Sequence, residues 1–170
     1  MTRFNLYAAA ALLAIAGLAD AAQSRAQGKE EQAIRDVEKS FAAAFMAKDV
    51  DAVMKLYVPG DELLVFDLVP PRQYAGWDAY KRDFADTFAS IRGSVKFEIT
   101  DLSVTTDGKL GWSHSIQHGI WTNTDGKAVD LTVRVTDCYK KIDGKWLIAL
   151  EHVSVPVDVG TGMADFSSKP

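Results

Sequence analysis

The chain is short of cysteine, histidine and positive charge, and each shortage excludes a class of protein. One cysteine, Cys138, among 170 residues leaves no internal disulfide, so stability must come from packing. Three histidines without cysteine partners offer no zinc-ligand pattern, and a formal net charge of −4 argues against a nucleic-acid surface. The sequence also lacks a phosphate-binding loop and a nucleophile elbow. We therefore expect no metal, no cofactor and no nucleic-acid partner.

An apolar run near the N-terminus is too short for a stable membrane span. It extends from about Leu6 to Ala19, follows the basic residue Arg3 and ends in the small-residue site Ala19-Asp20-Ala21. This pattern predicts a signal peptide, residues 1–21, and a periplasmic or secreted protein. Cleavage after Ala26 and an uncleaved anchor helix are the alternatives.

The first half of the remaining chain predicts three helices. Apolar residues recur three or four positions apart in residues 29–48 and 77–91, with a short helix ending at Tyr57 between them. Residues 77–91 carry an aromatic stripe, and Gly93 follows as a predicted C-terminal cap. Between the last two helices, an apolar strand carries Asp67 and stops at Pro70-Pro71.

After Gly93 the apolar period changes from 3.6 to 2, which predicts four antiparallel strands joined by Asp-Gly turns. Helices followed by a meander indicate an α+β fold, in which a curved antiparallel sheet and three N-terminal helices enclose a conical pocket. We expect one domain over residues 29–158 and a C-terminal tail over 159–170. Cys138 is interpreted as a small apolar residue of a strand.

The last hairpin carries ionisable groups inside otherwise apolar strands. A three-residue turn, Ile142-Asp143-Gly144, would pair Lys141 with Lys145 and place Asp137 and Glu151 on the face that meets the helices. A two-residue turn, Asp143-Gly144, would move Asp137 to the side of His152. We favour the first. The favoured register stacks Tyr139 on Leu147, Asp137 on Ala149, Val135 on Glu151 and Val133 on Val153.

Two stretches of the chain resemble the nuclear transport factor 2-like superfamily, and within it the SnoaL-like and ketosteroid isomerase-like proteins. They are residues 41–80, "FAAAFMAKDVDAVMKLYVPGDELLVFDLVPPRQYAGWDAY", and residues 134–156, with a "DGKW" turn and an "H-x-S" ending. The resemblance implies the cone-shaped fold described above. It also implies a general-base aspartate at Asp67 and a protonated aspartate at Asp137, whereas Phe41 stands at the position of the family's hydrogen-bonding tyrosine.

The leading hypothesis is an exported domain that binds a small, largely apolar ligand in the conical pocket. One alternative is an acid–base isomerase or dehydratase with Asp67 as base and Asp137 as acid. Another is a non-catalytic dimerisation module. The expected pocket residues are Trp77, Tyr80, His114, Tyr139, Glu151 and Val153. For His114, a satisfied core residue is the alternative. We expect a homodimer, with Arg134, His152 and Ser154, flanked by Trp146, Ile148 and Leu150, as a dimer face or an alternative pocket.

Overall fold

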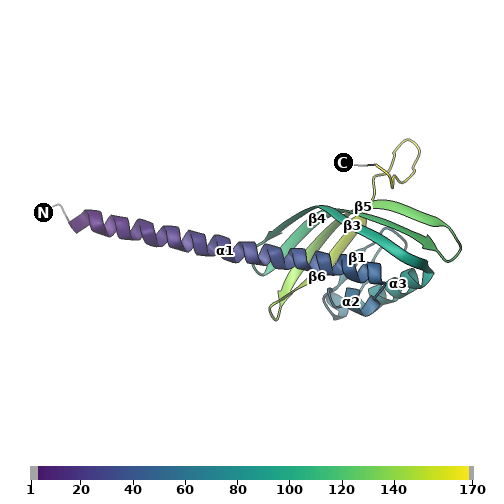
Figure 1. The fold of residues 1–170 in the computed structure, drawn as a ribbon, viewed down its shortest axis with the longest axis horizontal. Helices are drawn as coiled ribbons and strands as arrows, with labels where there is room; N and C mark the ends of the chain where they lie inside the picture. Colours follow the sequence, from purple (N-terminus) through teal and green to yellow (C-terminus); the bar gives the residue numbers. More distant parts are fainter. Residues whose placement is uncertain (1–3, 169–170) are drawn as a thin grey trace.

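The protein folds into a curved sheet with helices packed on its concave side (Figure 1). The computed structural model describes the backbone of residues 4–168 and the side chains of residues 24–168. The elements are α1 (Phe4–Ala47), α2 (Val50–Met54), a 3-10 turn η1 (Gly60–Glu62), β1 (Leu64–Phe66), β2 (Tyr74–Ala75), α3 (Trp77–Ser90), β3 (Ile91–Thr106), β4 (Leu110–Asn123), β5 (Ala128–Ile142) and β6 (Lys145–Ser154). The predicted signal-peptide residue Arg3 and the side chains of Ala19-Asp20-Ala21 lie outside the described residues.

The four long strands form the predicted antiparallel meander, and the α+β prediction is confirmed. Within the sheet the order is β2-β1-β6-β5-β4-β3. The short strand β1 pairs parallel to β6, with Val65 opposite Glu151, an arrangement that the sequence did not predict. This pairing places the end of β1, and therefore Asp67, beside the strand that carries Glu151.

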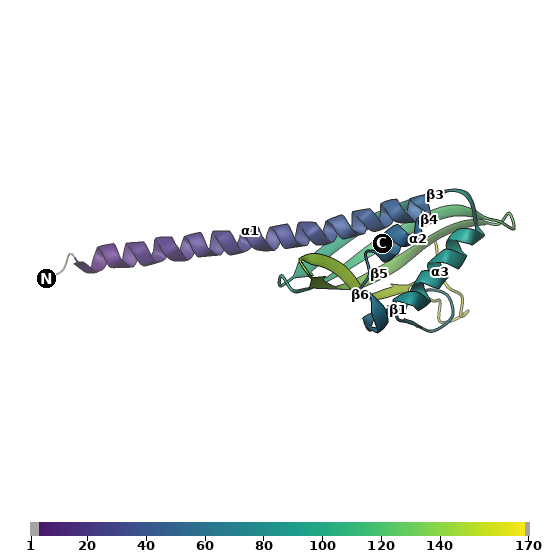
Figure 2. The same ribbon diagram turned by 90° about the horizontal axis from the view of Figure 1, so that it is seen from below.

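Irregularities in β3 bend the sheet around the helices (Figure 2). The register of β3 against β4 shifts between Arg92 and Lys96 and again between Thr100 and Ser103. Gly93 and Asp101 have φ angles of 77° and 50° at these shifts. Such bulges increase local twist and let a sheet curl. Gly93 therefore does not cap α3 as predicted, because the helix ends at Ser90 and Gly93 belongs to the bent strand.

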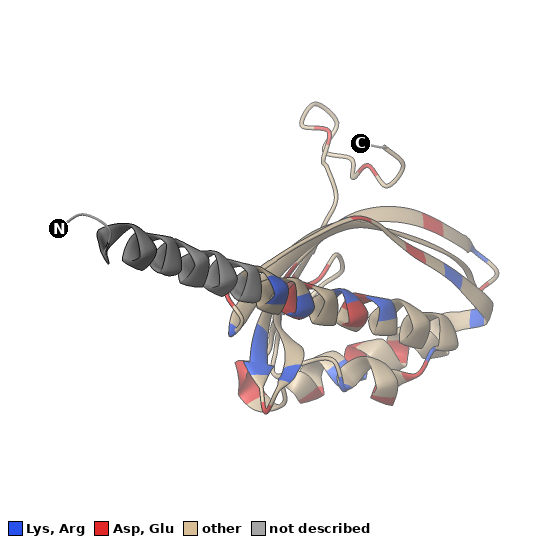
Figure 3. Cartoon of the chain, turned by 60° about the vertical axis from the view of Figure 1, so that its left-hand side comes forward, with Lys and Arg blue, Asp and Glu red and all other residues tan. Residues whose placement is uncertain are grey.

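Helix α1 is attached to the sheet from Glu30 onward. The Glu30 carboxylate accepts hydrogen bonds from Lys141 Nζ at 2.6 Å and from Trp146 Nε1 at 2.8 Å, and Ile34 is fully buried one turn later. The Lys141 hydrogen bond lowers the pKa of Glu30. Along the described part of α1, acidic and basic residues are interspersed (Figure 3). In the same view, no described segment of the chain is uniformly basic.

The turn of the last hairpin differs from the favoured prediction. Ile142 pairs with Lys145 across a two-residue Asp143-Gly144 turn, whose residues have φ angles of 49° and 79°. These positive values match the turn type that Asp-Gly favours. The predicted pairing of Lys141 with Lys145 and the stacking derived from it are therefore wrong.

A bulge at Ala149 restores the predicted orientation of the two acids. Tyr139 pairs with Ile148 but Cys138 pairs with Leu150, so Ala149 is an extra residue and Asp137 lies directly opposite Glu151. Because side chains alternate along a strand, one extra residue reverses the face of everything that follows it. Asp137 and Glu151 thus face the helices, as predicted, for a different reason.

The same bulge changes the predicted dimer face. Before the bulge, Trp146 and Ile148 are buried against the helices, so they cannot flank Arg134, His152 and Ser154 as expected. These three residues lie on the side of the sheet away from the helices, here called the outer face. Cys138 is also exposed there rather than packed in a core.

From Gly111 to Ser115, strand β4 presents small residues to the helices and larger ones, Trp112 and His114, to the outer face. A side chain at Gly111 would approach the Ile34 side chain of α1 to 2.7 Å, and one at Gly119 would approach the Trp121 ring to 2.6 Å. Only small residues fit where a helix or ring lies so close. His114 is therefore exposed on the outer face, and both predictions for it, a pocket residue and a buried core residue, are wrong.

Candidate functional site

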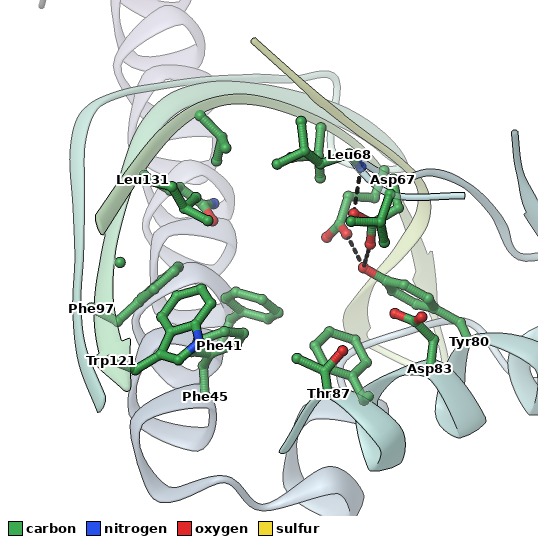
Figure 4. A pocket seen from close by; sticks show the side chains of 17 residues that line it. Phe41, Phe45, Asp67, Leu68, Tyr80, Asp83, Thr87, Phe97, Trp121 and Leu131 are labelled. Atoms are coloured by element: carbon green, nitrogen blue, oxygen red, sulfur yellow. Dashed lines mark hydrogen bonds between the residues drawn. The ribbon is translucent and has the colours of Figure 1, made fainter. Parts of the chain in front are cut away.

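The concave side of the sheet encloses a cavity of about 190 Å³ between α1, α3 and strands β3 to β6. Aromatic rings lie on one side of it and carboxyl groups on the other (Figure 4). The lining residues are Phe41, Phe45, Asp67, Leu68, Val69, Tyr80, Asp83, Phe84, Thr87, Phe97, Gln117, Gly119, Trp121, Leu131, Val133, Glu151 and Val153. The cavity wall therefore combines an apolar body with one acidic end.

Glu151 on β6 lies at the acidic end, almost fully buried and held by two tyrosines. Tyr57 Oη donates to Glu151 Oε2 at 2.6 Å, and Tyr80 Oη lies 2.5 Å from Oε1. Burial raises the pKa of Glu151 to about 7, although the two tyrosine hydrogen bonds act in the opposite direction. A carboxyl group with this pKa can either give or take a proton near neutral pH.

Asp67 lies at the end of the short strand β1, where the chain leaves the sheet. Its Oδ1 accepts a hydrogen bond from the Leu68 backbone N–H, and its Oδ2 lies 3.2 Å from Tyr80 Oη. Burial raises the pKa of Asp67, and the nearby Asp83 carboxylate raises it further. The strand-end position expected for the general base is thus occupied by a partly desolvated aspartate.

The Tyr80 hydroxyl lies between Glu151 and Asp67, and its single hydrogen limits how the three groups can be protonated. The hydroxyl has one hydrogen but lies within hydrogen-bond distance of both Glu151 and Asp67. If both contacts are hydrogen bonds, one of the carboxyl groups must itself be protonated and donate to the tyrosine oxygen. The geometry therefore favours a state in which Asp67, Tyr80 and Glu151 share one additional proton.

A second pair of acids lies behind Glu151, away from the cavity lining. Asp137 on β5 and Glu38 on α1 are only 1% and 2% exposed. Glu38 Oε1 accepts a hydrogen bond from Tyr139 Oη, which lies 2.8 Å from Ser113 Oγ. Burial raises the pKa of Asp137 well above its ordinary value, and the charges of Glu151 and Glu38 add to this effect.

Several residues expected at the pocket lie elsewhere. Trp77 donates its indole N–H to the Met54 carbonyl at 2.8 Å and is absent from the cavity lining. Tyr139 is buried beside Glu38 behind the cavity, and Asp137 does not line the cavity either. Of the expected residues, the cavity wall includes Asp67, Tyr80, Glu151 and Val153.

Glu38, Tyr57 and Asp83 were missed by the sequence analysis. Glu38 could have been found, because it lies four residues after Ile34 and three before Phe41, on the buried face of the predicted helix. The short helix α2 ends at Met54 rather than at Tyr57 as predicted, and no local pattern points Tyr57 at Glu151. Phe41 does line the cavity, but the hydroxyl groups at the acidic end come from Tyr57 and Tyr80 instead.

The described residues contain neither a metal-binding cluster nor a membrane-spanning helix. Among residues 24–168, no three His, Cys, Asp or Glu side chains are arranged to hold a metal ion. Within the same described part of the chain, no helix is both long and apolar enough to cross a membrane.

The chain belongs to the SnoaL-like domain family, whose sequence profile matches residues 34–158. It is similar to a nuclear transport factor 2-like protein of unknown function from Pseudomonas putida KT2440, at 26% identity and a TM-score of 0.73, covering 82% of this chain and 96% of that one. No curated protein matches the chain.

Two further structures share the fold at lower identity. A candidate scytalone dehydratase from Novosphingobium aromaticivorans is 15% identical with a TM-score of 0.71, over 86% of this chain and 93% of that one. A ketosteroid isomerase-like protein from Erwinia carotovora is 21% identical with a TM-score of 0.63, over 74% and 95%. At these identities the likeness shows the fold alone.

Stability should fall as the pH rises from about 4.5 to about 7. Burial raises the pKa of Glu151 from 4.5 to about 7, so across this window the folded state binds a proton that the unfolded chain has lost. The free energy of unfolding then decreases with pH, by on the order of 3 kcal/mol for this group alone. Exposed acids with lowered pKa values, such as Asp107, act below this window.

Urea unfolding at a series of pH values measures this slope. Glu151→Gln should remove this group's share of the slope, since glutamine keeps the shape but does not titrate. The part that comes from Asp67, Glu38 and Asp137, whose pKa values are also raised, should remain. Glu98→Gln, at an exposed position of β3, is the matched control and should leave the slope unchanged. A stability that rises between pH 4.5 and 7 would contradict the prediction.

Proposed function

We propose that the cavity binds a small, mainly apolar molecule and that Glu151 and Asp67 transfer protons to and from it. The observation that carries this proposal is the contact of Tyr80 with both acids at the one polar end of a ring-lined cavity. Asp137, the acid expected from the resemblance, does not line the cavity, so Glu151 takes that role in the proposal.

The size of the cavity favours a ligand of one or two rings. Its volume is about 190 Å³. An apolar cavity of about 150 Å³ can hold benzene, whereas sites for drug-sized ligands occupy roughly 300–1,000 Å³. A ring that packs against Phe41, Phe97 and Trp121 would fill most of the apolar side.

The charge of the lining favours an uncharged ligand that carries an oxygen. Three carboxyl groups, from Asp67, Asp83 and Glu151, line the cavity, and the lining contains no Lys, Arg or His. An anionic ligand would meet repulsion without a compensating cation. A ketone or a hydroxyl group could instead bond with the proton that Tyr80, Glu151 and Asp67 share.

The chemistry that fits this arrangement is proton transfer at a carbon next to a carbonyl group. The Asp67 carboxylate takes the carbon-bound proton, and protonated Glu151 gives its proton to the oxygen as negative charge develops there. Asp67 then returns its proton to another carbon, which completes an isomerisation, or to a leaving hydroxyl that departs as water, which completes a dehydration. In both cases the carbonyl re-forms as the oxygen-bound proton goes back to Glu151, so both acids recover their starting states. The names of the isomerase-like and dehydratase relatives support this class of reaction.

Binding can be tested with three ring compounds of similar size: 2-cyclohexenone, phenol and benzoate. We expect the first two to bind with millimolar affinity, as is usual for ligands of so few atoms, and benzoate to bind at least tenfold more weakly. Ligand-observed NMR measures the affinities. Leu131→Trp should fill the cavity and remove binding. If no compound binds, or benzoate binds best, the ligand proposal is wrong.

Proton transfer can be tested separately, with cyclohexanone as the bound compound. In deuterated water, the protein should accelerate exchange of the α-protons of cyclohexanone, because the Asp67 carboxylate can remove them. Asp67→Asn should abolish this exchange without weakening binding, whereas Asp36→Asn, at an exposed position on α1, should have no effect. Bound cyclohexanone that exchanges no faster than in buffer would leave binding as the function and contradict the catalytic part.

Export of the protein is the second part of the proposal. The support is the Arg3-to-Ala21 segment, together with the position of Glu30 as the start of the contacts between α1 and the sheet. Cleavage after Ala21 or Ala26 would leave these contacts intact. Intact-mass measurement of protein from the native host should therefore give a chain that starts at Ala22 or Gln27. Recovery of the full-length chain from the cytoplasm would rule out export.

We also propose a homodimer formed through the outer face. The support is two exposed large apolar side chains of β4 on this face, Trp112 at 45% and Ile120 at 37% exposure, with Arg134 and His152 on the neighbouring strands of the same face. Sedimentation at micromolar concentration should show a dimer that Trp112→Glu converts to a monomer. Val159→Glu, an exposed apolar position in the C-terminal tail, is the control. A wild-type monomer would overturn the proposal.

A further inference from the structure

Asp137 lies directly behind the proposed catalytic acid. It pairs with Glu151 across strands β5 and β6, so both side chains leave the sheet on the same face. Directly opposed residues have Cβ atoms about 5 Å apart. The charge state of Asp137, and of Glu38 beside it, therefore acts on Glu151 at short range and with little water between them.

Three neighbouring carboxyl groups cannot all be ionised in such surroundings. Their described hydrogen-bond partners are tyrosines and one another, with no basic side chain among them. The titratable and polar groups that face this cluster come from every packed element: Glu38 on α1, Tyr57 after α2, Asp67 after β1, Tyr80 on α3, Ser113 on β4, Asp137 and Tyr139 on β5, and Glu151 on β6. At least one proton must therefore remain in the cluster at neutral pH.

The hydrogen bonds decide which member of the rear pair carries the charge. Tyr139 donates to Glu38, and the Ser113 hydroxyl can donate to the oxygen of Tyr139, so a negative charge on Glu38 is well solvated by the protein. Asp137 receives no tyrosine or backbone hydrogen bond in the described part of the chain, and its Oδ1 has no partner there. A protonated Asp137 can instead donate to Glu38. Burial raises the pKa of Glu38, and the hydrogen bonds from Tyr139 and Asp137 oppose this rise by stabilising the ionised form.

We propose that Asp137 keeps a proton and donates a hydrogen bond to an ionised Glu38, and that this fixed charge behind the cavity maintains a protonated population of Glu151 at neutral pH. Asp137 and Glu38 are then positioning residues that act through Glu151 and do not touch a ligand. The inference rests on the proposed function, because it assigns a purpose to the protonated state of Glu151.

Two isosteric substitutions should have opposite outcomes. Glu38→Gln removes the charge of the pair, so the titration midpoint of Glu151 should move down by about one pH unit, the effect of one nearby charge in a partly screened site. Asp137→Asn keeps the shape and the hydrogen-bond donor of the protonated acid, leaves Glu38 charged, and should not move the midpoint. Carboxyl-carbon NMR of glutamate-labelled protein measures both, with Glu151→Gln to assign the signal.

Each outcome decides the inference. A midpoint that is unchanged or raised in Glu38→Gln overturns it, and so does a downward shift in Asp137→Asn equal to that in Glu38→Gln. Should Glu38→Gln fail to fold, the spectrum of aspartate-labelled wild-type protein provides the test, with Asp137→Asn to assign the signal. The Asp137 carboxyl carbon should stay at the neutral-acid position between pH 5 and pH 8, and ionisation of Asp137 in that range overturns the inference.

These measurements use the protein without ligand, so they separate the two proposals. If cyclohexanone exchange is not accelerated but Glu38→Gln lowers the titration midpoint of Glu151, the inference about Asp137 and Glu38 is supported and the catalytic proposal is wrong. If exchange is accelerated and depends on Asp67 but the titration midpoint of Glu151 does not change in Glu38→Gln, the catalytic proposal is supported and the inference about Asp137 and Glu38 is wrong.

Discussion

The burial of several carboxyl groups without a cation is the constraint on which the site depends. Glu38, Asp137 and Glu151 are each less than 5% exposed. Removing an ionised carboxylate from water costs several kcal/mol unless hydrogen bonds or a proton offset the cost. The chain supplies both kinds of compensation. Tyr57, Tyr80 and Tyr139 direct hydroxyl groups at the acids, and the raised pKa values of Asp137 and Glu151 mean that protons remain on the cluster.

The backbone that assembles this cluster depends on one extra residue. Without the bulge at Ala149, the two-residue turn at Asp143-Gly144 would send Glu151 to the outer face, into water. The bulge also marks where the inner face of β6 changes from large apolar residues to the residues of the site. Trp146 and Ile148, before it, complete the core under α1, and Glu151, after it, faces the cavity. A bulge next to a functional site is a common way of redirecting a side chain.

The sequence was sufficient for those features that depend on local periodicity. The aromatic stripe of Tyr80, Phe84 and Phe88 and the four strands with Asp-Gly turns follow from spacing and turn chemistry, and all are present. The helix predicted over residues 29–48 is present as the last part of the longer helix α1. The position of Asp67 at the end of a strand also followed. These features need no knowledge of what packs against them.

Features that depend on tertiary contacts could not be predicted from the spacing of residues in the sequence. Along most of strand β4, the larger side chains, including Trp112 and His114, share one face, and apolar patterning alone takes that face to be the inner one. The opposite face is buried because Gly111 leaves room for Ile34 of α1, a contact between residues 77 positions apart that no local pattern encodes. The bulge at Ala149 could not be predicted from the sequence either, because an alanine in a strand has no feature that shows whether it is paired.

The two pairs of acids differ in whether they reach the cavity. Glu151 and Asp67 meet the cavity, share the Tyr80 hydroxyl and can exchange protons with a ligand, whereas Asp137 and Glu38 are closed off behind the sheet surface. A protein selected only for stability would gain by replacing the rear pair with apolar residues of similar volume, since buried ionisable groups seldom repay their desolvation. Their presence directly behind Glu151 is easier to explain if the charge they hold is needed to set the protonation of the group in front of them.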